Sequence, residues 1–259
     1  MHPAIAGGWR RAKGIIMEPV SAVILVHNEA PVIEEVCRGI YNEVVQKIPG
    51  SEFVIAEDGS TDGTKEILKR IVPRMAGARL IEGKERKGYT RAYKDALRLC
   101  LNELIFFSDS SGKHDPADFW KLAEKIEECD MVIGCKAGRQ DPFYRVLMSR
   151  VFNFLVSRYF GCHFRDINSG FRLMKKRAIQ DVLGEDWHMK HLINFEFTLR
   201  VMAHGFRVVE IPVTHRPRAH GTSRGLPLKK IPAAIFMALR TFPELKSEMS
   251  RMRMSGGAP

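Results

Sequence analysis

Short apolar runs alternate with helical patterns along the first half of this chain, and this alternation limits its possible folds more than any other feature. The runs cover residues 20–26, 53–56, 79–81, 104–107 and 130–135. Between them, apolar residues recur at helical spacing over about a dozen residues, as in repeated strand–helix–strand units. Such units build a parallel sheet with helices on both faces, so the sequence predicts an α/β protein.

The rest of the chain adds flanking segments to one large domain. A length of 259 residues suits a single α/β core. We expect an N-terminal extension at 1–18, the main domain at 19–230, and a C-terminal amphipathic helix and tail at 231–259. Within the main domain, the patterns also predict a long helix at 143–160 and a last strand at 206–211.

Positive charge dominates the second half of the chain. The formal net charge is +11, and no Asp or Glu occurs between residues 211 and 243. This distribution favours an anionic partner such as a phosphate, a nucleotide or an acidic membrane surface. Aromatic residues are not interleaved with the basic ones, and no recognised nucleic-acid motif occurs, so nucleic acid is not expected as a partner.

Cysteine usage and hydropathy bear on the compartment. The five cysteines are scattered, without the tight spacing of a zinc site, which predicts reduced core thiols in a cytosolic protein. No window reaches the roughly 18 to 20 apolar residues of a membrane span, so integral insertion is not expected. The segment 231–242 either packs on the domain or lies as an amphipathic helix on a membrane. We therefore predict a cytoplasmic protein, with peripheral contact on the cytoplasmic membrane face as an alternative.

Polar side chains follow three of the predicted strands. His27-Asn28-Glu29 follows the first, the turn at 57–64 (EDGSTDGT) follows the second, and the stretch at 108–116 (SDSSGKHDP) follows the central one. In open α/β sheets, ligands bind at the carboxyl ends of the strands. No GxGxxG opens a helix after the first strand and no GxxxxGK[ST] is present, which disfavours dinucleotide enzymes and P-loop NTPases.

Taken in order, these motifs resemble the family 2 glycosyltransferases of GT-A fold. The strand-end segments, Lys87-Gly88 before a helix and the loop led by Asp109 all match the family pattern. Residues 166–172 (DINSGFR) and 218–224 (RAHGTSR) are similar to the DxxSGFR and RxxGxSK elements of the polyprenyl-phosphate branch, which includes dolichol-phosphate mannose synthases. The resemblance covers about residues 20–230. It implies a Rossmann-like three-layer sandwich with a mostly parallel central sheet.

The resemblance also implies a nucleotide-sugar donor site and a phosphate acceptor site. Residues that bind the base, ribose and diphosphate of a GDP- or UDP-sugar would be Asn28, Glu29, Asp58, Lys87 and Lys113. The acceptor phosphate would be bound by Arg139, Arg145 and Ser149, of which the last two fall on one helix face. A lid over the diphosphate would be formed by Arg218, Ser223 and Arg224. Membrane-bound members of the family carry C-terminal spans.

The loop after the central strand departs from the family pattern. Polyprenyl-phosphate members read like DADLQHPP there, so Ser111 and Lys113 replace an aspartate and a glutamine near the metal ion. One interpretation is that Asp109, with Ser111, still holds Mg²⁺ or Mn²⁺ through shared diphosphate oxygens. Another is that Lys113 supplies the positive charge and makes the metal less necessary, and a third is an inactive domain. We expect chelation by EDTA to inhibit activity only in part.

The type of acceptor decides whether a catalytic base is needed. A phosphate acceptor is already anionic at neutral pH, so direct displacement with inversion needs no strong base. A soluble or lipid hydroxyl acceptor would need one, and Asp166 and Glu196 are the candidates. Glu196 could instead pair structurally with an arginine. The predicted function is sugar transfer to a polyprenyl or dolichyl phosphate, with a hydroxyl acceptor or a non-catalytic nucleotide-sugar-binding domain as alternatives.

Overall fold

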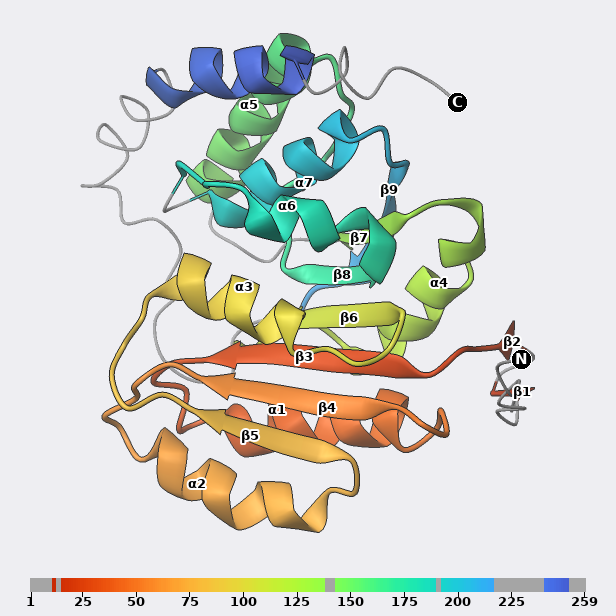
Figure 1. Cartoon of the computed structure of the whole chain (residues 1–259), viewed down its shortest axis with the longest axis vertical. Helices are drawn as coiled ribbons and strands as arrows, with labels where there is room; N and C mark the ends of the chain where they lie inside the picture. The colour runs from red at the N-terminus through yellow and green to blue at the C-terminus, as the bar shows by residue number, and fades with distance from the viewer. Residues whose placement is uncertain (1–10, 13–14, 138–142, 190–191, 217–239, 252–259) are drawn as a thin grey trace, which may run out of the picture.

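A seven-stranded sheet covered by helices on both faces forms the body of the protein (Figure 1). The computed structural model describes residues 11–12, 15–137, 143–189, 192–216 and 240–251. The strand order is β5-β4-β3-β6-β8-β7-β9, and a separate small hairpin joins β1 (Arg11–Ala12) to β2 (Ile15–Ile16). The predicted α/β class with a mostly parallel sheet is confirmed.

The first half of the sheet is entirely parallel. Its strands are β3 (Val20–Val26), β4 (Glu52–Glu57), β5 (Ala78–Glu82) and β6 (Leu104–Asp109). All seven residues of β3 are buried, as expected for a central strand covered on both faces. The connecting helices are α1 (Ile33–Ile40), continued by a π-helical turn at Tyr41–Val45, α2 (Thr64–Ile71) and α3 (Tyr89–Arg98).

The second half of the sheet is mixed. After α4 (Phe119–Ala123) and β7 (Met131–Ala137), the long helix α5 (Phe143–Phe160) leads to β8 (Phe171–Lys175). Strand β8 is antiparallel to both β6 and β7 and lies between them. The elements that follow are α6 (Gln180–Gly184), α7 (Ile193–Ala203), β9 (Val208–Thr214), which is parallel to β7, and a helix at 240–251.

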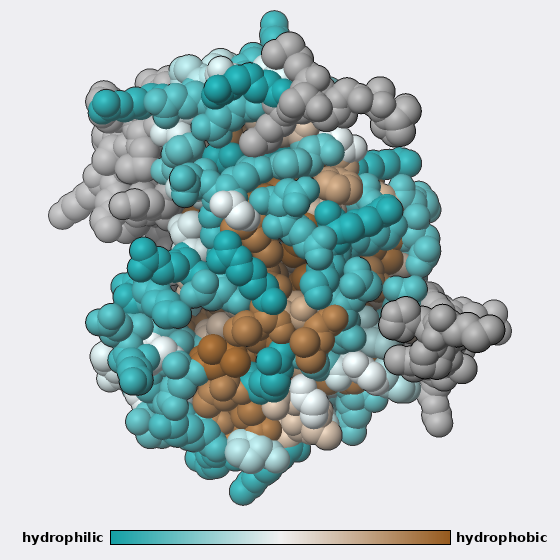
Figure 2. All heavy atoms as spheres, viewed as in Figure 1, coloured by the Kyte–Doolittle hydropathy of each residue, from teal (hydrophilic) through white to brown (hydrophobic). Residues whose placement is uncertain are grey.

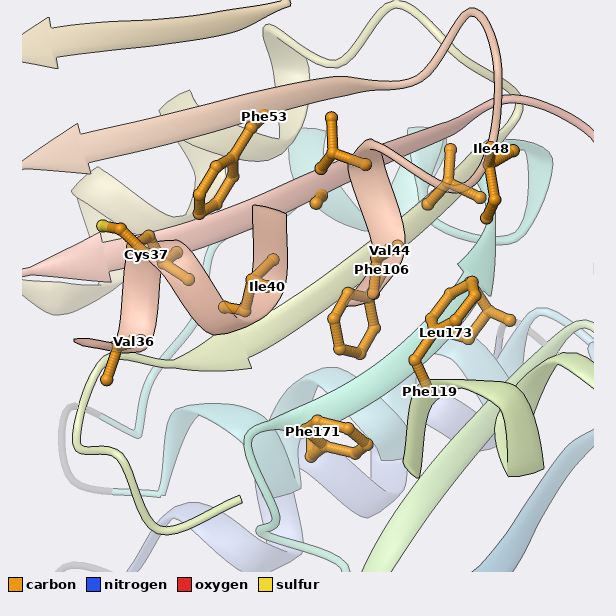
Figure 3. Packing of buried hydrophobic residues seen from close by; sticks show 14 of the residues in the cluster. Val36, Cys37, Ile40, Val44, Ile48, Phe53, Phe106, Phe119, Phe171 and Leu173 are labelled. Atoms are coloured by element: carbon orange, nitrogen blue, oxygen red, sulfur yellow. The ribbon is translucent and has the colours of Figure 1, made fainter. Parts of the chain in front are cut away.

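Two hydrophobic clusters cover the two faces of the sheet. In the first, Phe106 of β6 packs edge-on against Phe119 of α4 and Phe171 of β8, each with 5.0 Å between ring centroids (Figure 3). The neighbours of Phe106 in the strand, Ile105 and Phe107, point to the opposite face and join the second cluster, beneath α3, α6 and α7. This alternation is the period-two pattern of a strand buried on both sides.

A third cluster lies beyond the sheet, where α5 and α7 pack against the helix at 240–251. It contains Phe160, Phe195 and Leu245, all buried. The outer surface of the 240–251 helix is mostly hydrophilic in the view of Figure 2. No helix within the described ranges is both long and apolar enough to cross a membrane. All five cysteines are free and buried, which confirms their predicted place in the core.

Candidate active site

The carboxyl ends of the parallel strands bring the predicted site residues to one edge of the sheet. Strands β3, β4 and β5 point toward the same side of the molecule (Figure 1). The chain runs from β3 outward to β4 and later returns to place β6 on the other side of β3. Ligands bind in α/β sheets at such a reversal of strand order. The loops after β3, β4 and β6 therefore line a candidate active site.

The loop after β3 is built onto the turn after β4. Asn28 has a left-handed backbone (φ 56°), and its side-chain oxygen accepts a hydrogen bond from the Thr61 amide at 2.8 Å. The amide of Glu29 donates to Thr64 Oγ1 at 2.9 Å. The Asp62 carboxylate accepts the Ala30 amide at 3.2 Å and joins the two loops a third time. Asn28 and Glu29 thus lie in a cross-braced pair of loops.

The Asp58 carboxylate holds the loop that precedes α3. Its two oxygens accept the backbone amides of Lys87 at 2.6 Å and Gly88 at 3.1 Å. The Lys87 ammonium pairs with Asp95 at 3.1 Å on the exposed face of α3. A Cβ on Gly59 would lie 2.5 Å from the Arg86 amide nitrogen, so only glycine permits this close approach. Asp58 and Lys87 are brought together, through the Lys87 backbone.

Asp109 ends β6 and lies directly against Gly170. Its amide donates to the Gly170 carbonyl at 2.9 Å, and a Cβ on Gly170 would fall 2.3 Å from Asp109 Oδ1. Burial raises the pKa of Asp109 above its usual value, while the positive charges of Lys136 and Arg172 act in the opposite direction. The glycine of the DINSGFR segment therefore provides the space for the Asp109 carboxylate.

Asp166 stands near Asp109 and pairs with Lys136 of β7. The Lys136 ammonium lies 3.5 Å from Asp166 Oδ2, and both side chains are largely buried. Glu210 of β9 accepts the amides of Arg165 at 2.8 Å and Asp166 at 2.6 Å. Lys136 is not among the site residues predicted from the sequence, although it directly follows the predicted strand at 130–135.

Arg172 of β8 anchors the 166–170 loop from inside the protein. Its side chain is fully buried. The guanidinium donates to the carbonyls of Ser169, Ile167 and Asn194 at 2.7, 2.8 and 2.9 Å, and to Thr198 Oγ1 at 2.9 Å. Burial lowers the pKa of Arg172. The arginine thus ties the loop that carries Asp166 and Gly170 to helix α7.

The 110–114 loop is held by the chain that follows β9. Gly112 has a left-handed backbone (φ 70°), and the Lys113 carbonyl accepts the Arg216 amide at 2.7 Å. The His114 ring stacks on Phe171 with 4.9 Å between ring centroids. The His114 backbone forms an isolated antiparallel β-bridge with His215. Burial among positive charges holds the pKa of His114 well below its ordinary value. His114 is therefore a neutral support of the Asp109 loop.

The oxygen donors at this edge suit a metal ion that takes most of its ligands from a substrate. Within the described ranges, no group of three or more His, Cys, Asp or Glu side chains is placed to hold a metal ion. The loop offers the Asp109 carboxylate and the Ser111 hydroxyl, with Lys113 and Lys136 nearby. Mg²⁺ is often held by one or two carboxylates together with substrate phosphates, so this set fits such an ion.

Glu196 lies apart from these loops, in a buried cluster on α7. Its carboxylate pairs with Arg200 at 2.8 Å and accepts the amides of His188 and Met189 at 2.9 and 2.7 Å. Arg200 also pairs with Glu185 at 2.7 Å. These contacts correspond to the structural pairing considered for Glu196.

Four of the predicted acceptor and lid residues lie outside the described residues: Arg139, Arg218, Ser223 and Arg224. The same holds for most of the 231–242 segment. Arg145 lies in the first turn of α5. Ser149, one turn further, has a carbonyl that accepts the Asn153 side-chain amide at 2.7 Å. The roles proposed for these residues stay predictions.

Comparison with known proteins agrees with this geometry. The family model described as glycosyl transferase family 2 matches residues 21–183. The chain is 28% identical over 210 residues to glycosyltransferase AglD of Haloferax volcanii, covering 77% of this chain and 33% of that protein. It is 26% identical over 211 residues to dodecaprenyl-phosphate galacturonate synthase of Rhizobium johnstonii, covering 79% of this chain and 61% of that protein. It thus spans a third to three fifths of these relatives.

A solved structure shares the fold. The glucosyl-3-phosphoglycerate synthase of Mycobacterium tuberculosis, solved with Mn²⁺, UDP-glucose and phosphoglyceric acid, superposes with a TM-score of 0.62 at 18% identity. The match covers 88% of this chain and 80% of that one. The predicted GT-A fold is thereby confirmed. Because the family model covers more than half of the chain, and the loops it spans meet at one sheet edge, the protein belongs to glycosyl transferase family 2.

Proposed function

We propose that the protein transfers a sugar from a GDP- or UDP-sugar to a polyprenyl phosphate, with inversion at the anomeric carbon. The main support for this proposal is the position of the Asp109 carboxylate, which packs on Gly170 at the end of its strand, beside Lys136 and Arg172. Such an edge combines a carboxylate for the donor's metal ion with fixed positive charge for its diphosphate. The relative named as a dodecaprenyl-phosphate galacturonate synthase supports a lipid phosphate as the acceptor.

The donor half of the site is assigned to the braced loops after β3 and β4. Asn28, Glu29 and Asp58 would bind the base and ribose, because they lie in loops fixed to each other and to the 87–88 segment. Bound Mg²⁺ or Mn²⁺ would neutralise the charge that develops on the departing nucleoside diphosphate. Asp109 and Ser111 would hold that ion, and Lys113 and Lys136 would add positive charge beside the diphosphate.

The acceptor half is assigned to α5 and the basic segment that follows β9. Arg139, Arg145 and Ser149 would bind the acceptor phosphate, because a guanidinium matches phosphate oxygens through paired donors. Arg218, Ser223 and Arg224 would close over the donor diphosphate. The second pKa of a phosphate monoester is about 6, so the attacking oxygen is anionic at neutral pH and displaces the diphosphate directly.

A hydroxyl acceptor is the second candidate, because a carboxylate that could serve as the base lies beside Asp109. That carboxylate belongs to Asp166, which is largely buried and pairs with Lys136. Glu196 is less suited to the role, since Arg200 and two amides occupy its carboxylate. Asp166→Asn should abolish transfer to a hydroxyl acceptor but leave a phosphate acceptor reactive, since the phosphate needs no base.

Ligand-induced thermal stabilisation and a transfer assay test the proposal together. GDP, UDP and dTDP are added with and without Mn²⁺, and a ligand of the native state raises the melting temperature. Radiolabelled sugar transfer to undecaprenyl phosphate then separates an enzyme from a binding domain. Asp109→Asn should lose transfer while keeping its fold. The absence of a shift with every nucleotide would contradict the donor site, and a shift without transfer would favour the non-catalytic alternative.

A further inference from the structure

Helix α5 is apolar on both of its long sides, although only one side packs against the part of the protein that the structure describes. The inner side contributes Phe152, Val156 and Phe160 to the third hydrophobic cluster. A helix that is apolar all round is normally buried on every side or in contact with lipid. The outer side of α5 therefore calls for an explanation.

That outer side carries most of the exposed large apolar side chains in the described part of the chain. Nine such side chains are exposed among the described residues, and six of them belong to α5. These six, which we call the α5 stripe, are Leu147, Met148, Val151, Phe154, Leu155 and Tyr159. They recur every three or four residues and so form one continuous face. Phe154 is 68% exposed and Leu155 is 59% exposed, more than isolated surface residues would explain.

Positive charge accompanies the stripe. Arg150 and Arg158 are exposed on the same helix, and α5 contains no Asp or Glu. From the neighbouring 240–251 helix, the Lys246 ammonium lies 4.4 Å from the centre of the Tyr159 ring and donates to the Tyr159 carbonyl at 2.9 Å. Apolar side chains between cations are complementary to a bilayer surface with anionic headgroups, where both kinds of group are satisfied at once.

We propose that the α5 stripe is the surface by which the protein lies on a bilayer that contains anionic lipids. The apolar side chains would enter the boundary between headgroups and acyl chains, and Arg150 and Arg158 would contact the headgroups. This contact needs neither nucleotide nor acceptor. It therefore succeeds or fails independently of the proposed sugar transfer.

Vesicle binding by the full chain tests the proposal. We expect the protein to float with phosphatidylcholine vesicles that contain phosphatidylglycerol, and to bind pure phosphatidylcholine more weakly. Phe154→Gln combined with Leu155→Gln should reduce the partition coefficient at least about tenfold, because two apolar anchors are lost. Arg150→Gln combined with Arg158→Gln should reduce it by about tenfold or more on the anionic vesicles only.

Leu101→Gln is the matched control, because Leu101 is 72% exposed and lies outside α5. It should bind vesicles like the parent protein. Phe154→Trp should be quenched by brominated lipids and Leu101→Trp should not. Failure of the parent protein to bind anionic vesicles, or unchanged binding by the Phe154/Leu155 variant, would overturn the proposal.

Two other occupants of the stripe predict different results without vesicles. If a second copy of the chain covers it, the parent protein sediments as a dimer that the Phe154/Leu155 variant dissociates. If another segment of the same chain covers it, that variant melts at a clearly lower temperature than the parent. Either result would overturn the proposal, whereas an unchanged oligomeric state and melting temperature agree with a lipid-facing surface.

Discussion

Gly170 shows how closely the 166–170 loop and the end of β6 fit together at the scale of single residues. The Asp109 carboxylate occupies the space where any larger residue at position 170 would place its Cβ. A real Cβ cannot come within about 3 Å of backbone or packed side-chain atoms without displacing them. The conformation of Asp109 therefore depends on a residue that carries no chemistry.

Gly170→Ala should displace the Asp109 carboxylate and reduce transfer about a hundredfold or more, since small misplacements of a catalytic group have effects of that size. Steady-state kinetics with a nucleotide sugar would measure the loss. Gly184→Ala is the control, because open space surrounds its Cβ position, and it should leave kcat unchanged. Equal activity of the parent and Gly170→Ala would show that Asp109 does not act from the observed position.

Lys136 and Lys113 should differ in what they contribute. Lys136 is largely buried, pairs with Asp166 and exerts the stronger effect on Asp109. Lys136→Met should reduce kcat about 10²- to 10³-fold, as loss of one preorganised charge does, with partial rescue in Lys136→Arg.

Lys113→Gln should instead make activity more dependent on Mn²⁺, which titration of the metal after EDTA treatment would show. An unchanged metal response would remove Lys113 from the diphosphate site.

At the scale of elements, the strands with continuous apolar runs were predictable and β8 was not. The sequence predicts strand 20–26 with the same bounds as β3, and strand 104–107 lies within β6. The sequence predicts a turn at 166–172 and a short helix near 175–182, whereas Phe171–Lys175 form a strand. Its arginine and its lysine hide the apolar pattern, because Arg172 is buried through hydrogen bonds to carbonyls rather than by apolar contact.

Some parts of the site were likewise predictable from the sequence and others were not. The order of the motifs predicted the Asp58 and Asp109 loops, since each directly follows a strand whose end is visible in the sequence. Lys136 lies in β7, and Asp166 lies in the loop that leads to β8. The two become neighbours because β7 pairs with β8 and β9, which are distant in the sequence. Short-range patterns contain no information on such pairing.

Arg172→Met tests whether β8 and α7 support the site as one unit. Removing the guanidinium takes the donor from the buried Ser169 carbonyl, and it takes one donor from the carbonyls of Ile167 and Asn194, which also face the Thr198 hydroxyl. We expect a loss of at least about 3 kcal/mol in the free energy of unfolding, measured by urea denaturation. Thr198→Val removes only one partner of Arg172 and should cost about 1 kcal/mol. Similar costs for both variants would show that the arginine does not organise this region.

At the scale of the whole molecule, the carboxylates of Glu52 and Asp118 make the free energy of unfolding depend on pH. Burial would raise the pKa of Glu52, but hydrogen bonds from the Ser21 hydroxyl, the Leu101 amide and Arg79 outweigh it and lower the pKa. The pKa of Asp118 is lowered in the same way, by Lys121 and Thr214 against the effect of burial. A carboxylate with a lowered pKa in the native state binds fewer protons there than in the unfolded chain.

The unfolded chain therefore gains protons first as the pH falls, and the stability from these groups is lost. It is fully present above the ordinary pKa values, 4.5 for Glu52 and 3.8 for Asp118, and declines as the pH drops through the lowered values. Urea midpoints should fall between about pH 6 and about pH 3. Glu52→Gln should weaken this dependence and lower stability at neutral pH by about 1 to 3 kcal/mol. The exposed Glu66→Gln control should keep the dependence of the parent protein. A Glu52→Gln profile parallel to that of the parent would place the acid sensitivity elsewhere.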